Sequence, residues 1–275
     1  MNVPRSSYYY QSKPLSAQKQ RAEADLRDRI ERIACDFPRY GYRRITKQLK
    51  RDGVIVNHKK ILRIMREESL LCEVKRAWIT TTDSRHRFRR FPNLIKNVAA
   101  MGPNQIWASD ITYIRIANGF VYLAVILDTY SRKVIGYAIS KSLDSALTLH
   151  ALNAAIGQRQ PSSGCIHHSD QGVQYASEAY IKVLTTNRFH ISMAGKGNPY
   201  DNAMAESFFK TLKQEEVYLW DYETFEDVIQ RIPYFIEQVY NQKRLHSSLN
   251  YVPPDEFEQA FYENHHRESC QDITN

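Results

Sequence analysis

Residues 105–128 read QIWASDITYIRIANGFVYLAVILD, and this stretch decides the class of fold. Its two halves, 105–116 and 120–128, are rich in β-branched and aromatic residues, which are typical of strands. Asn118-Gly119 lies between them, and this pair is a strong signal for a hairpin turn because both residues tolerate a positive φ. The sequence therefore predicts two antiparallel strands joined by a tight turn.

Further elements follow this hairpin in a regular order. Lys133 to Ser140 has the composition of a third antiparallel strand. Three strands, helix, strand, helix, strand and helix then make a mixed α/β plan. The later elements are predicted from cap residues and apolar periodicity: a helix capped by Ser142 or Asp144 that ends near Arg159, a strand from Cys165 to His168, a helix from Ser177 to near Asn187, a strand from His190 to Met193, and a helix that begins at Asp201 or Asn202.

Three acidic residues stand at informative places in this plan. Asp110 lies on the first strand, Asp170 just past the fourth, and Glu206 in the first turns of the last helix, with the 35 residues 171–205 between the second acid and the third. Three carboxylates suit hard cations such as Mg²⁺, and a pair of such ions promotes phosphoryl transfer. The alternative is three separate structural roles: a buried salt bridge, a turn residue and a carboxylate at a helix N-terminus.

Two lysines share the helix face of Glu206. Lys210 and Lys213 follow it at i+4 and i+7, so all three side chains lie on one side. Either lysine could contact a DNA phosphate beside the acids, and for Lys210 an ordinary ion pair is the alternative. His167 and His168 point to opposite faces of their strand, so packing or DNA contact is favoured over metal ligation.

The net charge of +8 is distributed unevenly along the chain. Residues 1–100 contain 24 Lys/Arg and 10 Asp/Glu, a net of +14, whereas residues 101–275 contain 14 and 20, a net of −6. A basic front segment is typical of a chain that binds the phosphates of nucleic acid, and solubilising surface charge is the alternative. No long apolar run or signal peptide is evident, so a cytoplasmic protein without a membrane partner is expected.

The basic front segment also has the pattern of a helix-turn-helix. Arg43 to Arg51 predicts a short helix, and Asn57 is a plausible N-cap for a second helix that ends near Glu68. Such a pair can lay its second helix in the major groove of DNA, although a plain packing unit has the same pattern. The candidate DNA-binding residues are Arg43, Arg44, Lys59, Lys60 and Arg63.

These patterns divide the chain into four parts. A predicted amphipathic helix from Glu223 to Gln242 contains Pro233 and is expected to kink, and the polar end from about His265 is expected to be disordered. Arg244 either contacts DNA or braces the core, and the sequence leaves both interpretations open. The predicted parts are a helix-turn-helix-like DNA-binding region at 1–74, a basic linker at 75–100, a catalytic core at 101–220, and a C-terminal helix and tail at 221–275.

Five sequence blocks carry a resemblance to a known family. They are Arg39-Tyr-Gly-Tyr-Arg43-Arg-Ile, Trp107-x-x-Asp110-Ile-Thr-Tyr, His168-Ser-Asp170-Gln-Gly-Val-Gln-Tyr175, Asp201-Asn-Ala-Met-Ala-Glu206-Ser-Phe-Phe and Tyr240-Asn-x-x-Arg244-x-His246-Ser-Ser-Leu249. With the acid spacing, these blocks resemble the DDE transposase and retroviral-integrase superfamily. Within it, the chain is similar to the OrfB products of bacterial insertion sequences in the IS-three group. The front segment lacks the His-His-Cys-Cys zinc motif of retroviral integrases.

The resemblance implies a fold, a site and a reaction. The implied fold is α/β: an RNase H-like mixed sheet forms the integrase catalytic core, preceded by an N-terminal all-α helix-turn-helix domain. Asp110, Asp170 and Glu206 would hold two Mg²⁺ ions, for which Mn²⁺ can substitute, and Lys213 matches a basic residue of the family. The implied reaction is nicking at the 3′ ends of the element followed by strand transfer, without a covalent enzyme intermediate.

The resemblance also implies partners. These are DNA of the terminal repeats and of the target, an upstream OrfA product joined through a frameshift fusion, and further copies of the chain in a homo-oligomer on nucleoid DNA. Two other functions stay open: a DNA-binding regulator with an inert core, and an RNase H-like nuclease that acts on RNA–DNA hybrids. The intact set of acids disfavours the regulator, and the basic front segment disfavours the nuclease.

Overall fold

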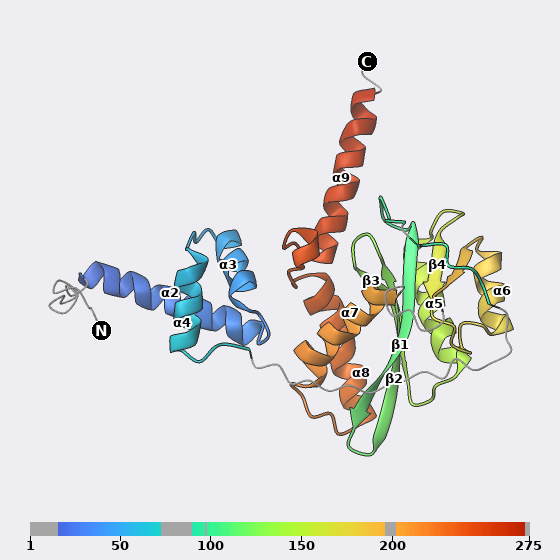
Figure 1. The fold of residues 1–275 in the computed structure, drawn as a ribbon, viewed down its shortest axis with the longest axis horizontal. Helices are drawn as coiled ribbons and strands as arrows, with labels where there is room; N and C mark the ends of the chain where they lie inside the picture. Colours follow the sequence, from blue (N-terminus) through green and yellow to red (C-terminus); the bar gives the residue numbers. More distant parts are fainter. Residues whose placement is uncertain (1–15, 73–89, 97, 196–201, 273–275) are drawn as a thin grey trace, which may run out of the picture. The chain divides into compact units, whose positions relative to one another are not determined.

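The structure is a computed structural model that describes residues 16–72, 90–96, 98–195 and 202–272, with the backbone alone after His265. The chain divides into two compact units, residues 1–75 and 76–275, which are described separately below (Figure 1). The basic linker predicted at 75–100 falls largely on residues outside the described ones. In the described parts of the chain, each helix is too short or too polar to cross a lipid bilayer.

The described part of the N-terminal unit contains three helices: α2 (Ala17–Asp36), α3 (Tyr42–Arg51) and α4 (His58–Glu67). Asn57 caps α4, because its side chain accepts a hydrogen bond from the backbone N–H of Lys59 at 2.8 Å. The predicted pair of short helices and its cap are therefore confirmed. All three helices contribute buried apolar side chains: Leu26, Ile30, Ile33, Ile45, Leu49, Ile61, Ile64 and Met65.

A five-stranded sheet in the order β3-β2-β1-β4-β5 forms the centre of the second unit (Figure 1). The first three strands are antiparallel, whereas β4 pairs in parallel with β1, and β5 with β4. The predicted hairpin is confirmed, and Gly119 adopts a φ of +123° at its turn. The strands are β1 (Ile106–Ile116), β2 (Gly119–Asp128), β3 (Val134–Ser140), β4 (Ile166–Ser169) and β5 (His190–Met193).

Helices cover both faces of this sheet. α5 (Ser145–Arg159) and α6 (Glu178–Thr186) pack on one face. The other face carries α7 (Ala203–Leu212), the π-helical turn η2 (Lys213–Val217), α8 (Phe225–Tyr234) and the π-helical segment η3 (Phe235–Asn241). The order of elements predicted for an RNase H-like core is therefore confirmed.

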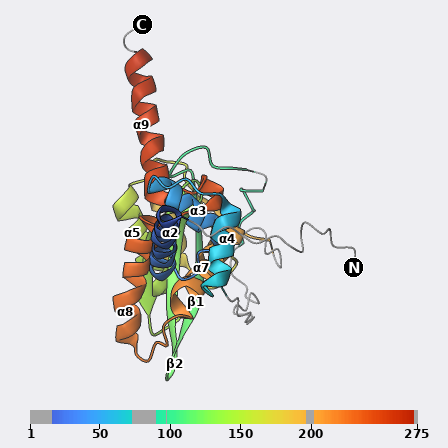
Figure 2. The same ribbon diagram turned by 90° about the vertical axis from the view of Figure 1, so that its left-hand side faces the viewer.

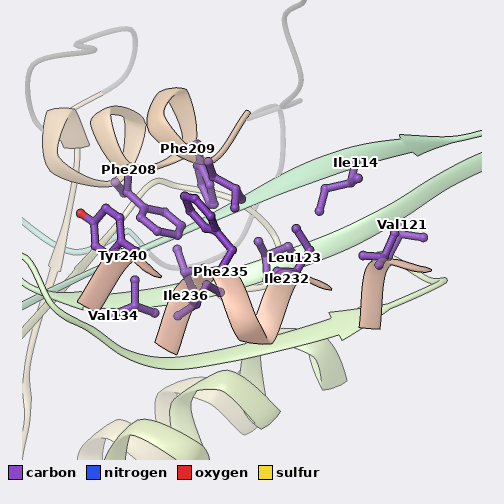
Figure 3. Packing of buried hydrophobic residues seen from close by; sticks show 14 of the residues in the cluster. Ile114, Val121, Leu123, Val134, Phe208, Phe209, Ile232, Phe235, Ile236 and Tyr240 are labelled. Atoms are coloured by element: carbon purple, nitrogen blue, oxygen red, sulfur yellow. The ribbon is translucent and has the colours of Figure 1, made fainter. Parts of the chain in front are cut away.

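The alternation of side chains along β2 explains these two layers. Leu123 packs with α7 and α8, whereas Ala124 packs with α5 on the opposite face, because successive strand residues point to opposite sides. Figure 3 shows the hydrophobic cluster that contains Leu123, in which Phe208 of α7 and Phe235 of η3 lie against the strands. The sheet is thus buried on both faces, which holds its strand ends rigidly.

The helix predicted over 223–242 is present but divided. It begins at Phe225 and changes from α to π geometry after Tyr234, directly beyond Pro233. A proline inside a helix removes one backbone donor and crowds the preceding turn, so a local change of helix geometry is the physical consequence.

The expectation of a disordered end from His265 is wrong for the described residues. The chain there belongs to α9 (Pro254–Asp272), which extends away from the sheet (Figure 2). Near its start, buried Glu258 pairs with Arg159 of α5. An anchored first turn favours continuation of the helix, because propagation is easier than nucleation.

Candidate active site

Asp110 and Asp170 occupy matching positions on neighbouring parallel strands. The β1–β4 ladder ends with the pair Ala108 and His168, and each aspartate follows its own strand's member of that pair by two residues. Adjacent strands lie about 4.8 Å apart, so the ladder brings together two residues that are distant in sequence. Both aspartates line one cavity of about 310 Å³. The sheet topology therefore assembles the first two predicted site residues.

The Asp110 carboxyl has a strongly perturbed pKa. Its side chain keeps some contact with solvent but is closely surrounded, and it accepts one backbone hydrogen bond, from the N–H of Ile111 at 2.8 Å. Burial, together with the negative charges of Asp170 and Glu206, raises its pKa to about 8, although Ile111 and Lys213 oppose the shift. Without a cation the carboxyl is therefore protonated at neutral pH, and a bound cation would favour its ionised form.

A tight turn fixes the Asp170 carboxylate. One of its oxygens, Oδ1, accepts a hydrogen bond from the backbone N–H of Gly172 at 2.9 Å. A Cβ atom at position 172 would lie only 2.9 Å from the same oxygen, a distance that real Cβ atoms essentially never show. A side chain at position 172 would therefore displace the Asp170 carboxylate from this hydrogen bond, which explains the glycine in Asp170-Gln-Gly172.

Glu206 lies on an exposed part of the first turns of α7, and a polar side chain ties this helix to β1. Asn202 Nδ2 donates a hydrogen bond to the carbonyl oxygen of Ser109 at 3.2 Å, and Asn202 is buried. Asn202 occupies the predicted N-cap position of α7, but its side chain makes no capping hydrogen bond. Asp201, the other predicted cap, lies outside the described residues. Sequence reasoning missed this positioning role, because an asparagine at a helix start normally caps it.

The carboxylate oxygens of the three acids are suitable ligands for a cation, but the described residues are not arranged as a complete metal site. No group of three His, Cys, Asp or Glu within the described ranges is placed to hold a metal ion. Two aspartates share the cavity, and Glu206 acts on Asp110 electrostatically. A donor set made only of carboxylate oxygens matches hard cations such as Mg²⁺.

Lys213 is the predicted basic residue that the structure brings to the acids. Its Nζ atom lies over the ring of Tyr113, 4.6 Å from the centroid. Burial lowers the pKa of Lys213, and the charge of Asp110 acts in the opposite direction. The lysine opens the π-helical turn η2, a local geometry often found at functional sites. Lys210, one turn earlier, is exposed on α7.

The two histidines before Asp170 serve packing. His167 Nε2 and the Tyr180 hydroxyl lie 2.9 Å apart, and His168 Nδ1 and the Ser192 hydroxyl lie 2.8 Å apart. Burial lowers the pKa of His167 to about 3, so its ring is neutral at physiological pH. The favoured packing interpretation fits both residues.

Arg244 is buried, and its guanidinium is engaged inside the protein. Its Nε and NH2 atoms each donate to a different oxygen of Glu215 at 2.7 Å, and its side chain is only 5% exposed. This bidentate pair ties the segment after η3 to η2. The geometry supports bracing of the core, and a DNA contact by Arg244 does not fit it.

The predicted DNA-binding cations of the N-terminal unit fall into two groups. Arg63 donates to Glu23 and to Glu67, both at 2.9 Å, and Lys60 pairs with Glu23 at 3.6 Å. These two cations join α4 to α2. The others lie elsewhere on the surface: Lys59 and Arg43 are exposed, and Arg43 and Arg44 lie over the rings of Tyr42 and Tyr40 at 5.4 and 5.5 Å.

Comparison with protein families matches two kinds of domain in this chain. A family described as "HTH-like domain" matches residues 20–78. Two families described as "Integrase core domain" match residues 100–199 and 187–254. The second of these extends over the helices that follow the acids.

Known proteins similar to this chain come from bacterial insertion sequences. The transposase for insertion sequence element IS904 of Lactococcus lactis is 38% identical, over 87% of this chain and 96% of its own length. The putative transposase InsK of IS150 from Escherichia coli is 33% identical, over 94% and 91%. A solved HTLV-2 integrase catalytic core in complex with magnesium is 18% identical with a TM-score of 0.46, covering 58% of this chain and 99% of that one. The chain belongs to the family of insertion-sequence transposases that carry an integrase core domain.

Proposed function

We propose that the chain nicks the 3′ ends of its insertion sequence and transfers the freed strands to target DNA, with Asp110, Asp170 and Glu206 as catalytic carboxylates. The observation that carries this proposal is the placement of Asp110 and Asp170 at one cavity by the β1–β4 ladder. The effect of Glu206 on the pKa of Asp110 supports the inclusion of the third acid. Closely surrounded carboxylates that face one another are typical of functional sites.

The chemistry of the three acids suits two Mg²⁺ ions, with Mn²⁺ as a substitute. Such ions, when bound, activate water or a 3′-hydroxyl and stabilise the leaving oxygen of a phosphodiester. The sheet holds the two aspartates, and the Asn202 bond to β1 holds the helix that carries Glu206. Lys213, whose Nζ atom lies over the Tyr113 ring, is the proposed contact for a DNA phosphate beside the acids.

DNA recognition is proposed for residues 1–74 and catalysis for residues 101–220. The match to an HTH-like domain and the net charge of +14 on residues 1–100 support the first assignment. Lys59 and Arg43 are the proposed phosphate contacts on the terminal repeats. Family membership further supports a frameshift fusion with OrfA, a homo-oligomer on DNA and association with the nucleoid.

A strand-transfer assay tests the proposed reaction. The full chain is incubated with Mg²⁺ and a labelled duplex that carries the element's end, pre-nicked to expose the 3′-hydroxyl. Wild type should join this end to target DNA, and Glu206→Gln should not. Glu263→Gln, which changes an exposed glutamate of α9, is the matched control and should join normally. Absence of product from wild type, both alone and fused to OrfA, would contradict the proposal.

Binding measurements separate a transposase from a regulator. Asp110→Asn should bind the terminal repeat as wild type does, because the substitution keeps the size of the side chain, and it should lose joining. Equal biological activity of Asp110→Asn and wild type would favour the regulator. Preferential hydrolysis of RNA–DNA hybrids would favour the nuclease.

A further inference from the structure

Within the described parts of the chain, no strand pairs with the β4-side edge of β1 beyond Ala108. Among the described residues, β4 pairs with β1 only as far as Ala108, whereas β1 continues to Ile116. The β1–β2 hairpin therefore extends past the end of β4 (Figure 1). Asp110 stands two residues beyond the last β1–β4 pair, so this edge begins at the candidate active site.

Aromatic and cationic side chains adjoin one another along this edge. We call the set Tyr113, Arg115, Phe120, Lys213 and Tyr218 the β1-edge patch. Lys213 Nζ lies 4.6 Å from the centroid of the Tyr113 ring, and the Phe120 ring meets Tyr113 edge-on at 5.3 Å. Arg115 is directly opposite Phe120 in the β1–β2 ladder. The backbone N–H of Tyr218 donates to the Lys213 carbonyl at 2.8 Å, so Tyr218 lies one helical turn beyond the lysine.

Two rings of the patch are about half exposed to solvent. Phe120 is 49% exposed and Tyr218 is 48% exposed. The side chain of Arg115 on β1 is also exposed to solvent. Tyr113 is partly buried and also lines the cavity that contains Asp110 and Asp170. The patch is therefore continuous with the candidate active site.

Rings interleaved with cations have a specific use in nucleic-acid binding. Cations attract the phosphates, and exposed rings stack on bases, but a base inside a duplex already stacks on its neighbours. Exposed rings therefore favour an unpaired strand over a duplex. A strand rises about 3.3 Å per residue, so the edge from Asp110 to Arg115 is about 17 Å long, which is enough to contact a few nucleotides.

We propose that the β1-edge patch binds unpaired DNA, namely the few nucleotides that separate from their complement beside the cut at the element's end. This inference rests on the proposed strand-transfer function, because it takes that reaction's DNA as the ligand. Lys213 and Arg115 contact the phosphates, and Tyr113, Phe120 and Tyr218 provide the stacking surface.

A binding comparison without divalent metal tests this proposal. Fluorescent duplexes of the element's end, one blunt and one with five unpaired terminal nucleotides, are titrated with the full chain in chelator. Wild type should bind the unpaired end roughly tenfold more tightly than the blunt end, on the scale of one or two stacked bases. Phe120→Ala and Tyr218→Ala should each reduce that preference severalfold. Tyr234→Ala, at a tyrosine of α8 that is 56% exposed, is the matched control and should leave it unchanged.

Stacking has its own spectroscopic readout. 2-Aminopurine placed among the unpaired nucleotides should lose fluorescence on binding to wild type and keep it with Phe120→Ala. No preference in wild type, an unchanged preference in both patch variants, or an equal loss in Tyr234→Ala would overturn the proposal. Joining of the pre-nicked duplex with Mg²⁺ is measured in parallel. Joining without a preference for unpaired ends refutes the patch alone, whereas absence of joining refutes the proposed function.

Discussion

Two acidic clusters of the catalytic unit, one around Asp128 and one around Asp110, differ in what surrounds their carboxylates. Asp128 is fully buried, accepts backbone hydrogen bonds from Asn104 at 2.6 Å and Tyr130 at 2.9 Å, and lies 3.5 Å from the guanidinium of Arg159. Asp110 accepts one backbone hydrogen bond and faces the negative charges of Asp170 and Glu206. Burial raises the pKa of both aspartates. Burial alone therefore does not separate a structural acid from a functional one.

The two clusters differ in the hydrogen-bond donors and cations that compensate the negative charge of the aspartate. Arg159 bonds Glu258 at 2.8 Å and Asn104 at 3.0 Å, and Lys133 pairs with Asp255 at 2.8 Å, so the Asp128 cluster is satisfied by protein groups. At Asp110 the groups that oppose the pKa shift are one backbone hydrogen bond, from Ile111, and the charge of Lys213. Neighbouring carboxylates repel one another unless a cation neutralises them, which supports the cation site proposed above.

The largest expected effect separates catalysis from stability. Asp110→Asn should reduce strand joining by roughly 1,000-fold or more, the scale seen when a transition-state stabiliser is removed. The variant should keep its stability at neutral pH, because the Asp110 carboxyl is already uncharged there when no cation is bound. Strand joining of a pre-nicked duplex and urea unfolding measure the two effects. A large loss of stability would place Asp110 in the structural class with Asp128.

Removal of the cation from the Asp128 cluster should lower the stability of the fold, unlike the substitution at Asp110. Arg159→Met should lower the free energy of unfolding by about 3–5 kcal/mol, because it leaves Asp128 and Glu258 buried without their cation. Urea unfolding measures this change, and Lys182→Met, at an exposed residue of α6, is the control. A loss under about 1 kcal/mol, typical of surface pairs, would mean that solvent reaches the cluster.

The pH dependence of stability sharpens the contrast. The pKa of Asp110 is raised from 3.8 to about 8, so the folded state binds this proton more tightly than the unfolded state. The contribution of Asp110 to the free energy of unfolding is therefore fully present below pH 3.8 and is lost as the pH rises towards 8. Because the side chain is partly solvated, we expect a loss on the order of 2 kcal/mol rather than the full value.

Unfolding in chelator between pH 5 and pH 9 measures this loss. The decline should be smaller in Asp110→Asn, and the contribution of Asp128 cancels because both proteins contain it. Mg²⁺ should restore stability to wild type above pH 8 and have little effect on the variant. Equal pH profiles for the two proteins would show that Asp110 is not the titrating group.

Local patterns predicted much of the fold. Alternating strands, the Asn118-Gly119 turn and the cap at Asn57 act over a few residues, so the sequence reveals them. The adjacency of Asp110 and Asp170 follows once β4 is placed parallel to β1. Nothing local distinguishes Asp110 from Asp128, since each lies in an apolar strand and their difference depends on residues far along the chain.

Contacts between residues far apart in the sequence also explain why the predictions for Arg244 and Asn202 are incomplete. The sequence around Arg244 suggests an exposed tail. In the structure, however, Arg244 forms a bidentate pair with Glu215 of η2 and is buried. Asn202 sits where a cap is expected, yet it bonds a strand residue that precedes it by more than ninety positions. Such contacts depend on the completed fold, and sequence periodicity contains no information about them.

The smallest expected effect applies the same distinction to the basic residues of α4. Lys59→Ala should weaken binding of the terminal-repeat duplex and reduce the slope of log K against log salt by about one, as for one lost phosphate contact. Arg63→Ala should change the slope less, because Arg63 already pairs with Glu23 and Glu67 at 2.9 Å. Titrations over a range of salt concentrations measure both slopes, with Lys182→Ala as the control. A larger change for Arg63 than for Lys59 would mean that DNA breaks the pairs between α4 and α2, so that a satisfied charge in the free protein can still become a binding contact.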